Sequence, residues 1–453
     1  MDKRIESDSL GEIRVPLTAL YGAQTQRAVE NFPVSELRLQ EQFIISLALI
    51  KKNAARVNGE LGLIDLRISD AVEEAAQELI DGKHKREFVV DVFQTGSGTS
   101  TNMNMNEVIA GRANQILSAK ELGGVKVHPN DHVNLCQSSN DVIPSALNIA
   151  VSGLVENELL PSLGKLKESL YKKSRQFAGI EKLGRTHLQD AVVMTLGDEF
   201  SAYAVQVEKD IDRLNRVKTE LLELSIGGTA VGTGINAHPE FAPRVIELIA
   251  ADTGIDFRET DNHFASQASQ DSSVAVSGVL NATGVSLTKI ANDIRWLSSG
   301  PRAGLGEINL PAVQPGSSIM PGKVNPVIPE AVLQVAAQLT GNDATITAAA
   351  KAGNFELNTM LPLIAYNLIQ STAILASVSG IFASKCIDGI SADADKCRSN
   401  VENSLDVAVK LIPYTGYDKA SEIAGKAYEQ GKTVKEVVRE EGILTDEQMK
   451  KVF

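Results

Sequence analysis

The stretch LNTMLPLIAYNLIQSTAILASVSGIFAS, residues 357–384, contains no charged side chain. A second stretch, SSVAVSGVLNATGVSLT at residues 272–288, is also uncharged. Elsewhere apolar residues such as Leu163, Leu166 and Leu170 recur at spacings of three and four, which predicts helices. A helix that is neutral on every face must be buried on every face. We therefore expect an all-α fold whose long central helices form the core of a homo-oligomeric bundle, since one chain cannot bury several of them.

Residues 357–384 imitate a membrane span, but polar residues such as Asn367 and Gln370, together with Pro362, interrupt the stretch. Lipid would leave those polar groups poorly satisfied, so we expect a helix buried in protein. The first residues, MDKRIE, are charged and lack the apolar run of a signal peptide. These features predict a soluble, cytoplasmic protein.

The composition excludes several classes of function. The chain has 453 residues and a net charge of −13, which argues against binding to nucleic acid or to anionic membranes, since both need basic surface. The three cysteines, Cys136, Cys386 and Cys397, form no CxxC pair, and the six histidines include no HExxH motif. We therefore expect neither a disulfide framework nor a metal site.

Proline placement gives the domain organisation. Five prolines fall between Pro311 and Pro329 with glycines among them, which predicts a loop over that segment. The long proline-free segments read as helices, and the sequence TDEQ at residues 445–448 is a capping-box pattern that predicts a last short helix. We expect three domains: an N-terminal domain with active-site loops at 1–136, a central long-helix bundle at 137–390 and a small helical domain at 391–453.

Four segments are dense in small polar residues. Hydroxyls, amides and exposed backbone N–H groups suit the oxygens of carboxylates. Any one such segment alone would be read as a helix cap or a turn, but four of them, with one lysine and one histidine, favour a binding site for a carboxylate. The segments are TGSGTSTN at 95–102, HPND with SSND at 128–131 and 138–141, GRTHLQD at 184–190 and GSSIMPGKVNP at 316–326.

Two segments resemble nucleotide-binding motifs but depart from them. The segment from Gly316 to Lys323 resembles a P-loop, but five residues instead of four separate its glycines and Val324 replaces the Ser or Thr. The segment from Gly232 to Ala237 fits GxGxxA, but LLEL at 221–224 before it reads as a helix end and not as a strand. A nicotinamide-dependent oxidoreductase is therefore disfavoured.

The segment GSSIMPGKVN at 316–325 matches the G-S-S-x-x-P-G-K-x-N signature of the fumarase/aspartase superfamily, and the resemblance runs from Arg4 into the tail. Within the superfamily the chain looks most like class II fumarases. It shares GAQTQR at 22–27, HPND at 128–131, SSND at 138–141 and AHPE at 237–240, and it has Ser139 where aspartases usually carry Thr. Two segments also resemble aspartases, GPRAG at 300–304 and VIPE at 327–330.

The resemblance implies a reaction and an assembly. It implies the reversible anti elimination of water from (S)-malate to give fumarate, a step of the tricarboxylic acid cycle, with no cofactor. It also implies a homotetramer in which three subunits contribute to each active site. The runner-up within the superfamily is aspartate ammonia-lyase. Lyases with larger leaving groups, which act on argininosuccinate or adenylosuccinate, need motifs that the sequence lacks, and an inactive helical scaffold is disfavoured because the motif residues are intact.

The resemblance also assigns catalytic roles. Ser317 is the base that removes the carbon proton, although a serine hydroxyl has a pKa far above neutral and needs strong local stabilisation. Lys323 and Asn325 bind the carboxylate that gains charge, as in an oxyanion hole. A water on His187 serves the opposite face, with Glu330 orienting the imidazole.

The remaining expected contacts hold the substrate or a second anion. The glycines and prolines around Ser317 also predict a mobile lid. The expected substrate contacts are Ser97, Gly98, Thr99, Asn102, Ser138, Ser139, Asn140, Thr186, Ser318 and Val324, and the segment matching a peripheral anion site is His128, Pro129, Asn130 and Asp131.

Overall fold

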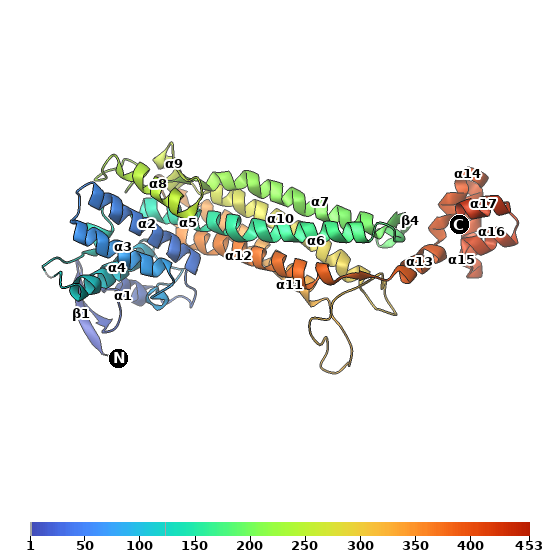
Figure 1. Cartoon of the computed structure of the whole chain (residues 1–453), viewed down its shortest axis with the longest axis horizontal. Helices are drawn as coiled ribbons and strands as arrows, with labels where there is room; N and C mark the ends of the chain where they lie inside the picture. The colour runs from blue at the N-terminus through green and yellow to red at the C-terminus, as the bar shows by residue number, and fades with distance from the viewer. Residues whose placement is uncertain (1, 123) are drawn as a thin grey trace. The chain divides into compact units, whose positions relative to one another are not determined.

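The computed structural model describes residues 2–122 and 124–453 (Figure 1). The chain divides into two compact units. Unit 1 contains Met1–Pro161, Asp210–Gly284 and Val335–Ser377, and unit 2 contains Ser162–Lys209, Val285–Gln334 and Val378–Phe453. Five long helices contribute residues to both units: α6 (Leu160–Gln176), α7 (Leu196–Val217), α10 (Asp271–Leu297), α11 (Val327–Ala350) and α12 (Leu361–Lys385).

The uncharged stretches of sequence are helices, as predicted. The stretch 272–288 lies in α10, and α12 takes up most of 357–384. By length and composition alone α10 and the segment Leu361–Gly389 could each cross a membrane, but 67% of the most apolar window of Leu361–Gly389 is buried in the protein. Core helices of globular proteins meet the same test, so α12 is a core helix. By contrast α10 leaves Val285 66% exposed on one face.

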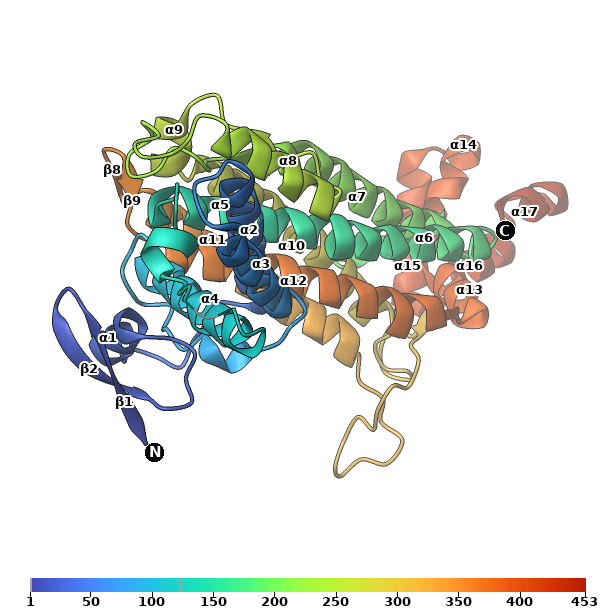
Figure 2. The same cartoon turned by 60° about the vertical axis from the view of Figure 1, so that its left-hand side comes forward.

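Helix α2 (Glu41–Glu60) forms the centre of the N-terminal part of unit 1. Its apolar residues follow helical spacing and are fully buried, among them Phe43, Leu47, Ile50 and Val57. It packs against α3 (Leu66–Ile80), α5 (Ser139–Leu154) and α8 (Phe241–Thr253), and these helices lie together in both views (Figures 1 and 2). Burial on several sides makes α2 the scaffold for the polar segments beside it.

The rest of unit 1 consists of the long helix α4 (Thr99–Ala119) and short elements. The short elements are the hairpin of β1 (Lys3–Asp8) and β2 (Gly11–Pro16), α1 (Ala23–Asn31), η1 (Lys85–Glu87), η2 (Pro129–Val133), η3 (Val155–Leu159), η4 (Lys218–Leu221), β5 (Glu223–Leu224), β6 (Arg258–Glu259), α9 (His263–Ala268), β8 (Gly353–Asn354) and β9 (Leu357–Asn358).

Unit 2 contains a hairpin and a C-terminal helical cluster. The hairpin pairs β3 (Glu181–Thr186) with β4 (Gln189–Thr195). The cluster is built around Leu411, Ile423 and Val438, and its last helix starts with the predicted capping box at Thr445. The other elements are β7 (Ile308–Asn309), η5 (Ile387–Gly389), β10 (Ser391–Ala392), α13 (Ala394–Asn403), η6 (Leu405–Leu411), α14 (Ile412–Thr415), α15 (Tyr417–Gln430), α16 (Val434–Glu440) and α17 (Asp446–Val452).

The all-α prediction is confirmed, because every sheet in the described residues has only two strands. The compact units do not test the three predicted domains, whose boundaries stay a prediction. Two local predictions were wrong. Pro329 lies in the first turn of α11 and not in the loop. The backbone N–H groups of a first turn have no acceptor within the helix, so a proline, which lacks this group, is tolerated there. Glu223–Leu224 is a short strand and not a helix end, but the next helix starts only at Phe241, so no dinucleotide-binding unit results.

Candidate active site

The first polar segment forms the N-terminus of α4. Gly98 precedes the helix with a φ of 76°, a conformation that favours glycine. Gly96 has no room for a side chain, since a Cβ would lie 1.8 Å from the carbonyl oxygen of Thr359. The hydroxyls of Ser97 and Thr99 lie 2.8 Å apart and hydrogen-bond to each other. Helix N-termini attract anions, so these two hydroxyls lie where a carboxylate is favoured.

Helix α4 and the start of α5 meet at an amide cluster. The side-chain amide of Asn102 donates to Ser139 Oγ at 3.0 Å and to Asn134 Oδ1 at 3.1 Å. Asn106 donates to the same oxygen of Asn134 at 3.1 Å. The structure therefore brings the predicted contacts Asn102 and Ser139 together, although 37 residues separate them in sequence.

The SSND segment caps α5. Ser138 and Asp141 form a reciprocal capping box, and the buried Asp141 carboxylate also accepts the backbone N–H groups of Gly227 and Thr229. Burial raises the pKa of Asp141 to about 7. The amide of Asn140 donates to the carbonyl oxygen of Ala230 at 2.7 Å. Asp141 thus fixes the loop after β5 against the start of α5.

The segment expected to form a peripheral anion site is a short, exposed π-helical turn, η2. His128 Nδ1 accepts the backbone N–H of Asp131, and Asp131 Oδ2 lies 3.2 Å from the same nitrogen. The amide of Asn130 lies 3.9 Å from the sulfur of Met103, and Pro129 is the first residue of the turn. The carboxylate of Asp131, beside His128, opposes the binding of an anion here.

In unit 2, Thr186 and His187 lie at the tip of the β3–β4 hairpin. Thr186 pairs with Gln189, so His187 and Leu188 are the two turn residues, with φ values of 57° and 62°. Two left-handed residues are typical of a type I′ turn, and they present the exposed His187 side chain away from the strands. No glycine marks this turn, so the sequence did not indicate its left-handed conformation.

Arg185, at the base of this tip, is tied to buried Glu307 by two hydrogen bonds of 2.7 and 3.0 Å. Glu307 is 0% exposed and also accepts from Asn400 at 2.9 Å. Lys182 lies 3.8 Å from the same carboxylate. These pairs hold the hairpin that carries Thr186 and His187.

The signature loop is closed by its own backbone. Gly316 N–H donates to the carbonyl oxygen of Lys323 at 2.9 Å, and the Asn325 amide donates to that of Gly316 at 2.6 Å. Ser317 Oγ accepts the N–H groups of Ile319 and Met320 at 3.2 and 3.0 Å. Two donors on one hydroxyl oxygen stabilise its negatively charged form, which a base role needs.

The other predicted residues of this loop are exposed. Ser318, Lys323 and Val324 face solvent. Glu330, in the first turn of α11, is partly buried. Neither Glu330 nor His187 has a side-chain hydrogen bond or ion pair to another residue among those described, so the expected contact between them is absent within this chain.

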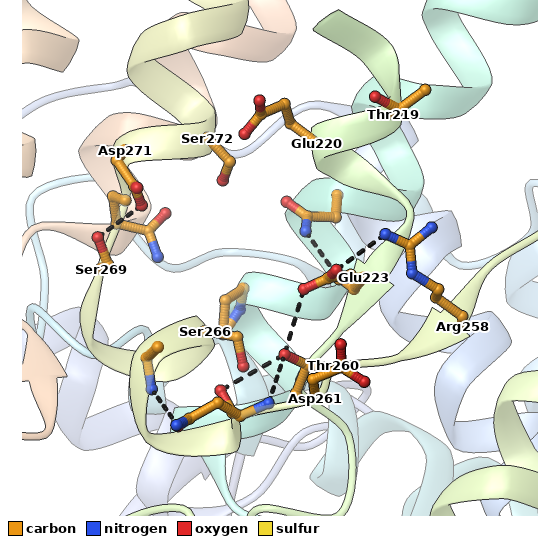
Figure 3. A pocket seen from close by; sticks show the side chains of 15 residues that line it. Thr219, Glu220, Glu223, Arg258, Thr260, Asp261, Ser266, Ser269, Asp271 and Ser272 are labelled. Atoms are coloured by element: carbon orange, nitrogen blue, oxygen red, sulfur yellow. Dashed lines mark hydrogen bonds and ion pairs between the residues drawn. The ribbon is translucent and has the colours of Figure 1, made fainter.

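A separate pocket of about 560 Å³ in unit 1 contains none of the predicted residues (Figure 3). Its wall includes Glu220, Glu223, Asp261 and Asp271 with a single arginine, Arg258, which is paired with Glu223 at 2.8 Å. An acidic wall repels carboxylates, so this pocket is not a site for an anionic substrate.

Sequence reasoning missed three residues beside the amide cluster. Lys51, Asn134 and Gln137 hydrogen-bond to one another there. A signal existed for Lys51, which takes the place of an apolar residue in the buried face that includes Leu47 and Ala54. Arg185 and Glu307 were also missed, since a pair 122 residues apart leaves no periodic pattern.

An all-α fold with four carboxylate-suited segments is typical of one class of lyases, and comparison with known proteins agrees. A family model described as "Lyase" matches residues 11–341, and one described as "Fumarase C C-terminus" matches residues 409–453. The chain therefore belongs to this lyase family.

Individual relatives indicate which members of the lyase family this chain is most similar to. A class II fumarate hydratase of Nitrosomonas europaea is 50% identical over 98% of this chain and 96% of its own length. One from Halobacterium salinarum is 51% identical over 98% and 94%. The crystal structure of a class II fumarase from Schistosoma mansoni superposes with a TM-score of 0.93 at 38% identity, covering 100% of this chain and 98% of that one. Within the lyase family the chain thus groups with class II fumarate hydratases, which are hydro-lyases, as the sequence predicted.

Proposed function

We propose that this chain interconverts (S)-malate and fumarate, with Ser317 removing the carbon proton. The observation that supports Ser317 most directly is its hydroxyl oxygen, which accepts two backbone N–H groups. Proton removal beside a carboxylate places a second negative charge on that carboxylate. Lys323 and Asn325, in the same loop, supply a cation and an amide to stabilise it.

The leaving hydroxyl departs on the opposite face. In this proposal a water held by His187 delivers the proton, so that the hydroxyl leaves as water while the electron pair of the broken C–H bond forms the double bond. Glu330 orients the imidazole. Ser97, Thr99, Asn102, Ser138, Ser139, Asn140, Thr186 and Ser318 bind the carboxylates and the hydroxyl.

We propose that the active site is completed between subunits of a homotetramer. Two observations support this: Glu330 and His187 have no partner among the described residues of one chain, and α10 leaves Val285 66% exposed. A bundle of subunits would cover this face and bring the Glu330 of one chain to the His187 of another.

Aspartate ammonia-lyase is the alternative activity. Ser139 accepts from the amide of Asn102, so its own proton is free to point at a substrate oxygen. A hydroxyl with one donor bond and one lone pair left can serve either substrate, so the choice of malate rests on the similarity of the chain to class II fumarate hydratases. The test is fumarate formation from each substrate, given at the end of the Discussion.

We propose a cytoplasmic location. Cys136, Cys386 and Cys397 are all free and buried. Unpaired cysteines fit a reducing compartment. Fractionation of the source cells with an activity assay on each fraction tests this.

A further inference from the structure

Lys51 is a fully buried cation in the middle of α2, with 0% of its surface exposed. Its ammonium donates to Asn134 Oδ1 at 3.0 Å and to Gln137 Oε1 at 2.9 Å. Both acceptors are neutral amides. No described carboxylate forms an ion pair or a hydrogen bond with Lys51.

The acid whose charge acts on Lys51 is Asp141, and its carboxylate already has other hydrogen-bond partners. Asp141 acts on Lys51 through space, but its carboxylate accepts the backbone N–H groups of Ser138, Gly227 and Thr229 instead. A buried ammonium without a contacting counter-ion is costly. Burial accordingly lowers the pKa of Lys51 to about 7. An anion that bound nearby would recover part of that cost.

A chain of hydrogen bonds connects Lys51 to the predicted substrate contacts. Asn134 Oδ1 accepts from Lys51 and also from Asn102 and Asn106, both at 3.1 Å. Three donors on one oxygen fix the orientation of the Asn134 amide. The second hydrogen of the Asn102 amide then points at Ser139 Oγ, which leaves the Ser139 proton free to donate outward.

The same cluster holds unmatched acceptors. The side-chain oxygens of Asn102 and Asn106 are buried and have no hydrogen-bond partner. Their residues are 1% and 0% exposed. Buried acceptors without donors are rare, and only a donor, such as a water or the hydroxyl of a substrate, would complete them.

We propose that Lys51 is a positioning residue that supplies the buried positive charge for a substrate carboxylate held at Ser139 and the N-terminus of α4. It acts through Asn134 and Asn102 and does not touch the substrate. The inference rests on the proposed function, which places Asn102 and Ser139 against the dicarboxylate. It also explains how an acidic protein of net charge −13 attracts a dianion.

The test compares two neighbouring lysines. Lys51→Met removes the buried charge, while Lys52→Met removes one that pairs with Asp252 at 2.9 Å at the edge of the same helix. Inhibition constants are measured for succinate and for succinamate, in which an amide replaces one carboxylate. We expect the preference of the wild type for succinate to shrink at least about tenfold in Lys51→Met and to stay unchanged in Lys52→Met, with thermal unfolding of Lys51→Met equal or higher.

If Lys51 has only a structural role, its loss loosens the cluster and weakens the binding of both inhibitors by the same factor. An unchanged preference in a folded Lys51→Met protein overturns the proposal. Should Lys51→Met fail to fold, Asn134→Asp serves instead, because it gives the ammonium a contacting counter-ion within the cluster. It should then cancel the charge and reduce the succinate preference by a similar factor, and an unchanged preference counts against the proposal.

The outcomes also separate this inference from the proposed function. If calorimetry shows that the wild type prefers succinate over succinamate more strongly than Lys51→Met does, but the wild type makes no fumarate from malate, the inference stands and the proposed function is rejected. A wild type that makes fumarate, with the same succinate preference as Lys51→Met, keeps the function and rejects the inference. A wild type that binds no dicarboxylate rejects both.

Discussion

Arg185 and Glu307, far apart in sequence, form a two-hydrogen-bond ion pair of 2.7 and 3.0 Å directly below the hairpin turn that carries His187. Glu307 is fully buried, and Lys182, 3.8 Å away, adds a second cation. Removing a buried partner leaves the remaining charges unpaired, which costs more than the pair itself is worth.

We therefore expect Glu307→Gln to lower the free energy of unfolding by about 3–5 kcal/mol, since Arg185 would lose its counter-ion, whereas Lys182 keeps its ion pair with Glu199 at 2.9 Å. Chemical denaturation with urea measures this. Asp395→Asn is the matched control, because Asp395 is exposed and pairs with exposed Arg398 at 3.6 Å, and it should change stability by less than about 0.5 kcal/mol. Equal effects of the two substitutions would refute a structural role for the pair.

Ser317→Ala should lower kcat about a thousandfold, because general-base catalysis is typically worth two to four orders of magnitude. Stability should not change, since the hydroxyl accepts only two N–H groups of an exposed loop. Val313→Ala, in the same irregular segment but outside the signature, is the control and should keep wild-type kcat. A Ser317→Ala enzyme with near-normal kcat would show that another group removes the proton.

Val285→Asp should dissociate the oligomer and abolish turnover. Val285 is 66% exposed on α10 in one chain, and a carboxylate there would be buried without a partner once subunits cover that face. Val285→Ala removes apolar area without adding charge and should stay both assembled and active. Sedimentation velocity with parallel assays decides, and an active monomer would contradict the proposed shared site.

The affinity for succinate should fall as pH rises above about 7. The pKa of Lys51, lowered to about 7 by burial, makes the unliganded lysine lose its proton there, and a bound dianion favours the protonated form. Inhibition constants should rise by up to about tenfold per pH unit between pH 7 and 9 in the wild type and less steeply in Lys51→Met. Parallel slopes would mean that Lys51 does not govern binding.

Other titrating groups around α2 do not confuse this comparison, because all of them remain in Lys51→Met. Asp141 of α5, whose pKa is raised to about 7 by burial, gains negative charge in the same range and weakens binding in the same direction. Burial lowers the pKa of His132 in η2. Charged groups on other elements against α2 include Glu73 of α3, Lys85 of η1, Glu107 of α4, Asp131 of η2, and Arg244 and Asp252 of α8.

The sequence predicted the fold where the pattern was local. The uncharged stretches became α10 and α12, and the capping box at Thr445 starts α17. The predicted substrate contacts Asn102 and Ser139, each near a helix N-terminus, hydrogen-bond to each other, while their role in binding stays a prediction. The roles of Ser317, His187 and Glu330 remain predictions.

What the sequence could not predict depends on tertiary contacts. The turn at His187 was not predicted because its two left-handed residues are not glycines, and the hairpin imposes their conformation. Lys51 interrupts the apolar face of α2, but its complete burial beside Asn134 and Gln137 follows only from the packing on several sides of the helix. Arg185 and Glu307 become neighbours only through the fold.

The most direct test of the account is the ultraviolet absorbance of fumarate formed by the purified protein without added metal or nucleotide. One cuvette contains (S)-malate and the other L-aspartate. We predict that absorbance grows with malate alone, and that Ser317→Ala and His187→Asn remove this growth. Growth with aspartate alone would keep the fold and the signature loop but contradict the proposed substrate, and no growth with either would contradict the proposed reaction.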